Sequence, residues 1–270
     1  MSTPRFCPIP AGTLTPGLDD DERQALQVFL PGQDFAAEAP RAAVDVDAFA
    51  LSETPVTRGQ FRAFVVDGGY ANPQWWAADQ QLLDHVGGQA ALVTQAQTAG
   101  PRTWRTPLGD DEDDDLPVDG VSWFEARAFA RFSDARLPTA VEWEWAARGP
   151  ERRTFPWSST LTMLDVVRSG HLDDGCVQQQ RPQAHFSSPT LTAVGAVKRT
   201  SPFGVLDLAG NVAEWTSTAV DGNLPGLELR VLCGDVHRAP LPRMHGAAKA
   251  VHEAHRRLPG FGFRLARSSG

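Results

Sequence analysis

The chain has 270 residues with a formal net charge of −8, and 41% of its residues are hydrophobic while 21% are charged. These proportions are typical of a globular protein, and the length suits one large domain, which we expect to cover residues 1–270. The negative charge argues against a nucleic-acid partner. The N-terminus lacks the apolar core of a secretory signal, and no window approaches the roughly 18 apolar residues that span a bilayer, so we expect a cytoplasmic protein with no membrane partner.

Three helices are predicted, and the rest of the chain is expected to form short strands and long loops because it contains 24 Gly and 21 Pro. The first helix begins near Thr57 and ends at Gly68-Gly69. The other two begin at capping boxes, in which a hydroxyl and a carboxylate satisfy unpaired amides at a helix start. These boxes are Ser122-Trp-Phe-Glu125 and Thr139-Ala-Val-Glu142, and Gly149 ends the last helix.

The longest charge cluster is the acidic run at residues 110–115. Such a run is usually a solvated loop, although clustered like charges can also hold a cation. The cysteines Cys7, Cys176 and Cys233 are odd in number and far apart, so we expect reduced thiols rather than a disulfide framework.

Residues 201–216 combine turn-forming glycines with oxygen-bearing side chains. Gly204 and Gly210 allow tight turns, while Asp207, Asn211 and Glu214 offer oxygens that can converge on one point. Calcium takes six to eight oxygen ligands from carboxylates and backbone carbonyls. The segment is therefore a candidate calcium site, and the alternative is an ordinary polar turn.

Other short segments with a distinctive order of residues follow one another over most of the chain. They are, in order, Ile9-Pro-Ala-Gly-Thr13, Glu53-Thr-Pro-Val-Thr-Arg-Gly-Gln-Phe61, Pro117-Val-Asp-Gly-Val-Ser-Trp-Phe-Glu-Ala126, Arg136-Leu-Pro-Thr-Ala-Val-Glu-Trp-Glu-Trp-Ala-Ala-Arg-Gly149, Phe155-Pro-Trp157, Arg230-Val-Leu232 and Gly262-Phe-Arg-Leu-Ala266. From about residue 6 to 267 the chain resembles the formylglycine-generating enzyme (sulfatase-modifying factor) family. Asp67-Gly-Gly-Tyr-Ala-Asn-Pro-Gln-Trp-Trp76 and Pro101-Arg-Thr-Trp104 look most like its ergothioneine-pathway sulfoxide synthase branch.

The resemblance implies an α+β, C-type-lectin-like fold with little regular secondary structure, several short antiparallel strands and bound calcium. Matching the family's calcium motif assigns the ion to Asp207, the carbonyls of Gly210 and Val212, and the carboxylate of Glu214. A second family site would lie near residues 169–175, where the match is poor.

The resemblance does not extend to the copper site of the family. The copper-dependent members hold Cu(I) with two cysteines, and a gap-free count from Gly234 places Ala239 and Met244 at those positions. Alanine has no ligand atom, and one thioether cannot replace two thiolates. We therefore expect no bound copper and no formylglycine generation. The sulfoxide synthases instead hold iron with histidines of an additional helical domain.

A different metal site could be built from the C-terminal segment. Its candidate ligands are His245, His252 and His255, of which the last two would share one face of a helical turn. Exposed or packing histidines are the alternative. Cys233 and His237 are candidate catalytic residues, although a lone cysteine is more often a small buried apolar group.

Departures from the family pattern concentrate in residues 233–260, between two well-matched flanks. Changed loops on a retained scaffold are how binding surfaces usually alter. We therefore predict a calcium-stabilised module that binds an unknown protein or small-molecule ligand, with a metal-dependent oxidoreductase, using non-heme iron or another metal, as the alternative. The ligand contacts would come from arginines, which suit carboxylate and phosphate groups. They are Arg238, Arg243, Arg256 and Arg257.

Overall fold

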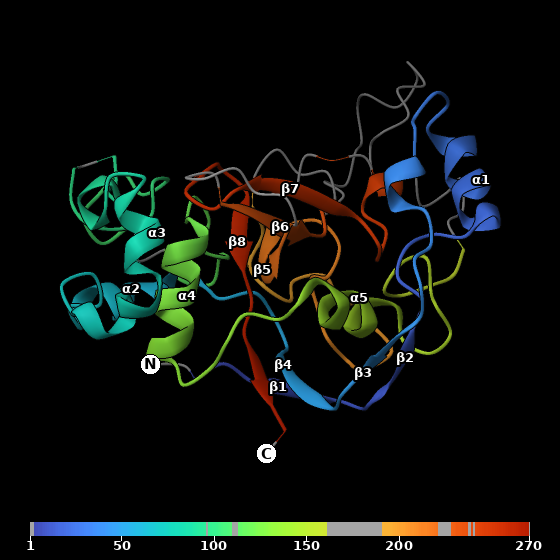
Figure 1. The fold of residues 1–270 in the computed structure, drawn as a ribbon, viewed down its shortest axis with the longest axis horizontal. Helices are drawn as coiled ribbons and strands as arrows, with labels where there is room; N and C mark the ends of the chain where they lie inside the picture. The colour runs from blue at the N-terminus through green and yellow to red at the C-terminus, as the bar shows by residue number, and fades with distance from the viewer. Residues whose placement is uncertain are drawn as a thin grey trace.

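The computed structural model describes residues 3–95, 97–109, 113–160, 191–220, 228–236, 239 and 241–269 (Figure 1). Its helices are α1 (Asp20–Phe29), α2 (Arg58–Val66), α3 (Gln80–Asp84), α4 (Trp123–Phe132) and α5 (Ala140–Arg148), joined by short 3-10 turns. The strands are β1 (Phe6–Ile9), β2 (Gly12–Leu14), β3 (Val44–Val46), β4 (Phe49–Ser52), β5 (Ala213–Ala219), β6 (Leu229–Cys233), β7 (Lys249–Glu253), β8 (Phe261–Phe263) and β9 (Ala266–Ser268).

The three predicted helices are confirmed as α2, α4 and α5. Each begins with a capping box, in which the side chains of Thr57, Ser122 and Thr139 accept from the third amide of their helices. Gly149 ends α5 with a φ of +62°, a conformation that glycine adopts without steric cost. The structure adds the short α3 and also α1, whose capping box pairs Asp19 with Glu22.

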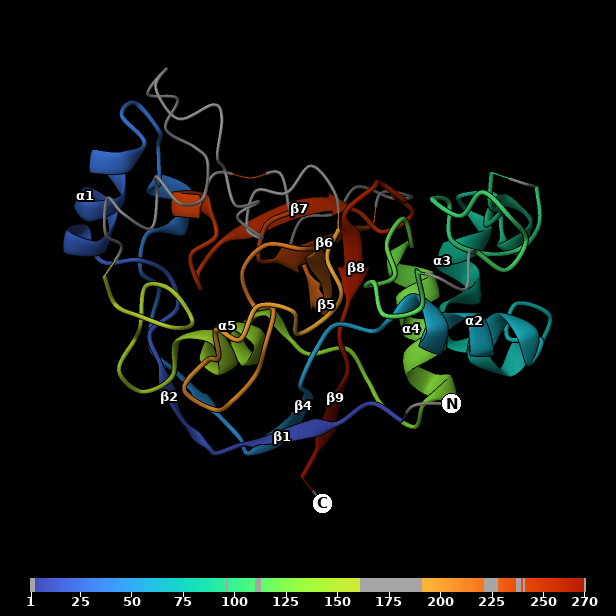
Figure 2. The same cartoon turned by 180° about the vertical axis from the view of Figure 1, so that it is seen from behind.

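The strands form three small sheets. Four strands lie in the order β7-β6-β5-β8, in which all neighbours are antiparallel except β5 and β8. A three-stranded antiparallel sheet has the order β1-β4-β9, and β2 pairs with β3. The four-stranded sheet lies between α2, α3 and α4 at one end of the molecule and α1 at the other (Figure 1, Figure 2). This α+β arrangement matches the predicted fold class.

Two large apolar clusters form most of the core. One joins α2 and α4 to the four-stranded sheet, and there Phe61 stacks on Phe129 with ring centroids 5.3 Å apart. The other surrounds α5. Two indole N–H groups link α4 to β5. Trp123 donates to the carbonyl of Thr216, and Trp215 donates to the carbonyl of Val121, which precedes α4, both at 2.9 Å.

Two of the acids in the described part of the acidic run form ion pairs and are not simply solvated. Asp113 and Asp114 form ion pairs with Arg58 and Arg62 of α2. Residues 110–112 lie outside the described part of the chain. The arginines supply the neutralising charge that a cation would otherwise provide. Among the described helices, none has both the length and the apolar character needed to cross a membrane.

Candidate functional site

The predicted calcium segment forms a left-handed turn that leads into β5. Asp207, Gly210 and Asn211 have φ values of +54°, +78° and +63°. The Asp207 carboxylate accepts a hydrogen bond from the Gly195 amide at 2.6 Å, and its backbone carbonyl accepts one from Arg264 at 3.1 Å. Burial raises the pKa of Asp207, against the lowering effect of the Gly195 hydrogen bond. The turn thus holds Asp207 in a largely buried position.

Glu214 of β5 is fully buried and already has a cationic partner. Its two oxygens accept from Nε and Nη2 of Arg264 at 2.6 and 2.8 Å, and Trp143 donates to the same carboxylate at 2.7 Å. Arg264 therefore neutralises the charge of Glu214, a carboxylate that the calcium prediction pairs with the ion instead. The Asp207 carboxylate has no salt bridge within the described ranges, so it is the member of the predicted set whose charge fits a cation best.

The two positions expected to replace the copper cysteines lie in a small apolar cluster. Met244 has no exposed surface and Ala239 is 8% exposed; both pack with Ala209, and Trp157 lies against them. This cluster offers one thioether and no thiolate. The residues present therefore do not fit Cu(I), which favours paired soft sulfur ligands.

The structure places the catalytic candidate Cys233 in the core. It ends β6 with no exposed surface, and its thiol contacts the carbonyl of Ala140 at 4.0 Å. Burial raises the pKa of this thiol strongly, so the reactive thiolate is suppressed. His237, the other candidate, lies outside the described residues.

The three-histidine site is not formed. His245 is fully buried against the ring of Phe35, while His252 lies in β7 against Phe261, with ring centroids 4.8 Å apart. His255 follows the strand, beside Glu253. The expected helical turn is wrong because His252 belongs to an extended strand that pairs with β6. Nowhere in the described ranges do three His, Cys, Asp or Glu side chains lie close enough to hold a metal.

The predicted arginine surface is only partly formed. Arg257 is buried and makes a bidentate ion pair with Glu125, both contacts being 2.9 Å, so its guanidinium is engaged inside the protein. Arg256 is half-exposed and pairs with Glu253, and Arg243 lies 3.8 Å from Asp235. Arg238 lies outside the described residues. Of the four arginines, only two are described with accessible side chains.

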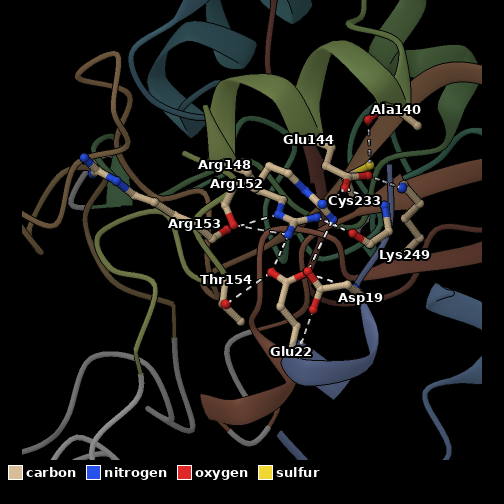
Figure 3. A network of polar contacts seen from close by, with 11 residues as sticks. Asp19, Glu22, Ala140, Glu144, Arg148, Arg152, Arg153, Thr154, Cys233 and Lys249 are labelled. Atoms are coloured by element: carbon tan, nitrogen blue, oxygen red, sulfur yellow. Dashed lines mark hydrogen bonds and ion pairs between the residues drawn. The ribbon is translucent and has the colours of Figure 1, made fainter. Parts of the chain in front are cut away.

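A buried polar network that the sequence alone did not indicate lies at the C-terminal end of α5 (Figure 3). Arg148 has no exposed side-chain surface, and it pairs with Glu22 of α1 and with Glu144 one turn earlier, at 3.0 Å. Glu144 also accepts from the Gly17 amide at 2.8 Å and pairs with Lys249 of β7. The Glu144–Arg148 spacing of four residues was the available signal. The network joins α1, α5 and β7.

The imidazole of His245 lies near this network. Neither ring nitrogen has a partner in the described part of the structure, and Nε2 lies 3.8 Å from Oε1 of Glu38. Burial, followed by the positive charges of Arg243, Arg148 and Lys249, lowers its pKa to about 3. His245 is therefore neutral at physiological pH.

With this geometry in view, comparison with known proteins decides the family. The model of the sulfatase-modifying factor enzyme 1-like domain matches residues 1–269. The chain belongs to this sulfatase-modifying factor family. It is 34% identical over 229 residues to a formylglycine-generating enzyme of Mycobacterium tuberculosis, covering 71% of this chain and 73% of that protein.

A second relative within the sulfatase-modifying factor family is a hercynine oxygenase of Mycolicibacterium smegmatis. It is 31% identical over 230 residues, which cover 78% of this chain and 48% of that protein. The chain thus spans less than half the length of this relative. PvdO from Pseudomonas aeruginosa shares the fold, with a TM-score of 0.61 and 20% identity over 98% of this chain and 95% of that chain.

Proposed function

We propose that the chain is a binding module built on the sulfatase-modifying factor scaffold and does not generate formylglycine with copper. The observation that carries this proposal is the apolar packing of Ala239 and Met244, since neither a methyl group nor a single thioether replaces two thiolates. The burial of Cys233 supports it, because this thiol is withdrawn from solvent.

A peptide assay tests the proposal that the chain does not generate formylglycine with copper. A sulfatase-type peptide containing one cysteine is incubated with the protein and copper, and mass spectrometry follows its thiol over time. We expect the thiol to persist, as it does without protein. Turnover of the thiol that depends on both copper and protein would refute the proposal.

The proposed recognition surface consists of the solvent-accessible side chains in the C-terminal segment of residues 233–260. Arg243 and Arg256 present guanidinium groups that suit carboxylate or phosphate oxygens on a ligand. The buried Arg257 is left out because its donors are used by Glu125 and backbone carbonyls.

A double variant, Arg243→Ala with Arg256→Ala, tests this surface. Affinity capture from cell extract is compared with that of the native protein and with a control double variant, Arg41→Ala with Arg102→Ala, which removes the same charge at two exposed positions elsewhere. We expect the first variant alone to lose the ligand. Identical capture by all three proteins would remove this surface from the proposal.

The second candidate function is a metal-dependent oxidoreductase, favoured by the 31% identity to a hercynine oxygenase. Its metal ligands would have to include residues outside the described ranges or residues of another chain, because the described side chains form no suitable group of three. Metal analysis of the purified protein separates the two proposals: stoichiometric iron, copper or zinc favours the enzyme, and calcium alone favours the binding module.

A further inference from the structure

An open cavity of about 570 Å³ lies where α4 and the segment after it meet β5, β9 and the start of α5. This volume lies within the range of small-molecule sites. In Figure 1 the segment that follows α4 runs across to α5, above β9. The cavity lining includes Arg127, Arg131, Arg136 and Glu142, with Ala130 and Ala135 beside them. None of these residues belongs to the C-terminal recognition surface, so the cavity is a separate site.

Two of the lining arginines share one carboxylate. Arg127 and Arg131, one turn apart on α4, contact the two oxygens of Asp79 at 2.9 and 2.6 Å. Asp79 is nearly buried, whereas the two arginine side chains remain 34% and 23% exposed. One negative charge therefore faces two positive charges. Arg136, the third arginine of the lining, adds no further unpaired positive charge because it is paired with Glu142 through two contacts of 2.6 and 2.8 Å.

The guanidinium groups are held in place before any ligand arrives. Arg127 lies over the ring of Trp123, with Cζ 4.6 Å from the ring centroid, and Arg230 lies over the same ring at 4.0 Å. Arg131 also donates to the carbonyl of Trp75 at 2.6 Å. Pre-positioned side chains lose less conformational entropy on binding, so their donors suit a ligand better than mobile surface arginines do.

The charge at this cavity is opposite to that of the chain as a whole. Burial lowers the pKa of Arg127; Asp79 opposes this, while Arg131 and Arg230 lower it further. A ligand anion would relieve this repulsion between like charges. Ala130 and Ala135 leave room beside the arginines, and the hydroxyls of Ser217 and Ser268 add polar groups to the wall.

We propose that this cavity binds a small organic anion through its carboxylate or phosphate oxygens, with Arg127 and Arg131 as the principal contacts. Guanidinium groups form strong, directional hydrogen bonds with both kinds of oxyanion. The net charge of −8 of the whole chain disfavours a large polyanion, which leaves a small molecule as the ligand that fits both the volume and the charge.

Titration calorimetry of the whole protein at low ionic strength tests the proposal with three probes. Succinate and inorganic phosphate distinguish a carboxylate from a phosphate ligand, and the neutral diamide of succinate controls for shape. We expect one or both anions to bind and the diamide not to bind. Absence of binding by both anions at millimolar concentration would overturn the proposal.

Variants locate the binding. Arg127→Gln leaves Asp79 paired with Arg131 and should weaken anion binding by at least about tenfold, because a charge-assisted hydrogen bond is lost. Arg41→Gln, which removes an exposed charge elsewhere, should leave the affinity unchanged. Ala135→Leu keeps every charge but fills part of the cavity, so it should also weaken binding and remains informative if Arg127→Gln does not fold. Native affinity in folded Arg127→Gln or Ala135→Leu protein would refute the site.

Discussion

Arg264 and Glu214 face each other across the end of the four-stranded sheet as a bidentate ion pair in which neither side chain has exposed surface. The pair links β5 to the segment after β8, and Arg264 also donates to the carbonyls of Ser52 and Leu206, at 3.1 and 3.0 Å. Three distant parts of the chain thus depend on one guanidinium. Loss of either partner leaves a buried charge without compensation, which is more costly than the pair itself is stabilising.

We expect Glu214→Gln to lower the free energy of unfolding by about 3–5 kcal/mol, measured by urea denaturation. Glu253→Gln, which breaks the exposed contact with Arg256, should cost about 1 kcal/mol or less. A double variant, Glu214→Gln with Arg264→Met, should be more stable than the sum of the single effects predicts, because no charge is left unpaired. Equal losses at the buried and the exposed glutamate would contradict the account.

Calcium binding is best tested at Asp207. An ion that binds only the folded state stabilises it by about 2.7 kcal/mol at a hundredfold excess over its dissociation constant, so a chelator should lower the melting temperature. Asp207→Asn should abolish this sensitivity. Glu214 is the weaker choice, since its loss also frees Arg264. Asp235→Asn, at another largely buried carboxylate, serves as the control and should keep the chelator effect. A chelator effect that survives Asp207→Asn would place the ion elsewhere.

His245 should make the protein less stable in acid. Its pKa is lowered from 6.5 to about 3, so between these values the unfolded chain binds a proton that the folded chain does not. Stability from this group is complete above the ordinary histidine pKa and is lost as pH falls toward 3, with a slope of up to about 1.4 kcal/mol per pH unit. His245→Leu removes two unpartnered nitrogens and should flatten the slope in denaturant titrations across this window.

His255→Leu provides the matched control because His255 is 42% exposed in the same part of the chain. Because His245 is intact in this variant, the loss of stability in acid should persist. If the His245→Leu and native curves stay parallel through the acid window, His245 is not the group responsible.

Cys233 should resist alkylation until the protein unfolds. Cys7 in β1 is only partly buried, whereas Cys233 has no exposed surface and a more strongly raised pKa. Because the thiolate is the nucleophile, iodoacetamide should modify Cys7 before Cys233, as followed by peptide mapping. Denaturant should remove the difference. Equal rates in the native protein would show that the β6 terminus opens readily.

The helices could be predicted because their signals are local. The boxes at Ser122 and Thr139 each fit within four residues, and the structure forms both. The same kind of signal was present at Asp19 and Glu22 and would have revealed α1. A carboxylate, Asp19, caps α1, whereas hydroxyls cap the helices that begin after Ser122 and Thr139.

Local sequence signals could not predict which of the C-terminal arginines are buried in ion pairs and which are exposed. Arg257 pairs with Glu125, and Arg264 with Glu214, across long stretches of sequence. Nothing in the residues beside Arg257 distinguishes it from the half-exposed Arg256. Burial of a charge depends on a partner that only the tertiary fold supplies, so the candidate surface could be located by segment but not by residue.

The sheet of β1, β4 and β9 ties the earliest strand of the chain to the last one. During synthesis on a ribosome, β1 and β4 can pair as soon as both have emerged, but the other edge of β4 stays open until β9 leaves the exit tunnel. The same delay applies to Arg264, which precedes β9 and closes contacts with β4 and β5. Folding of this chain should therefore finish only after β9 has emerged, at a rate limited by contacts between distant residues.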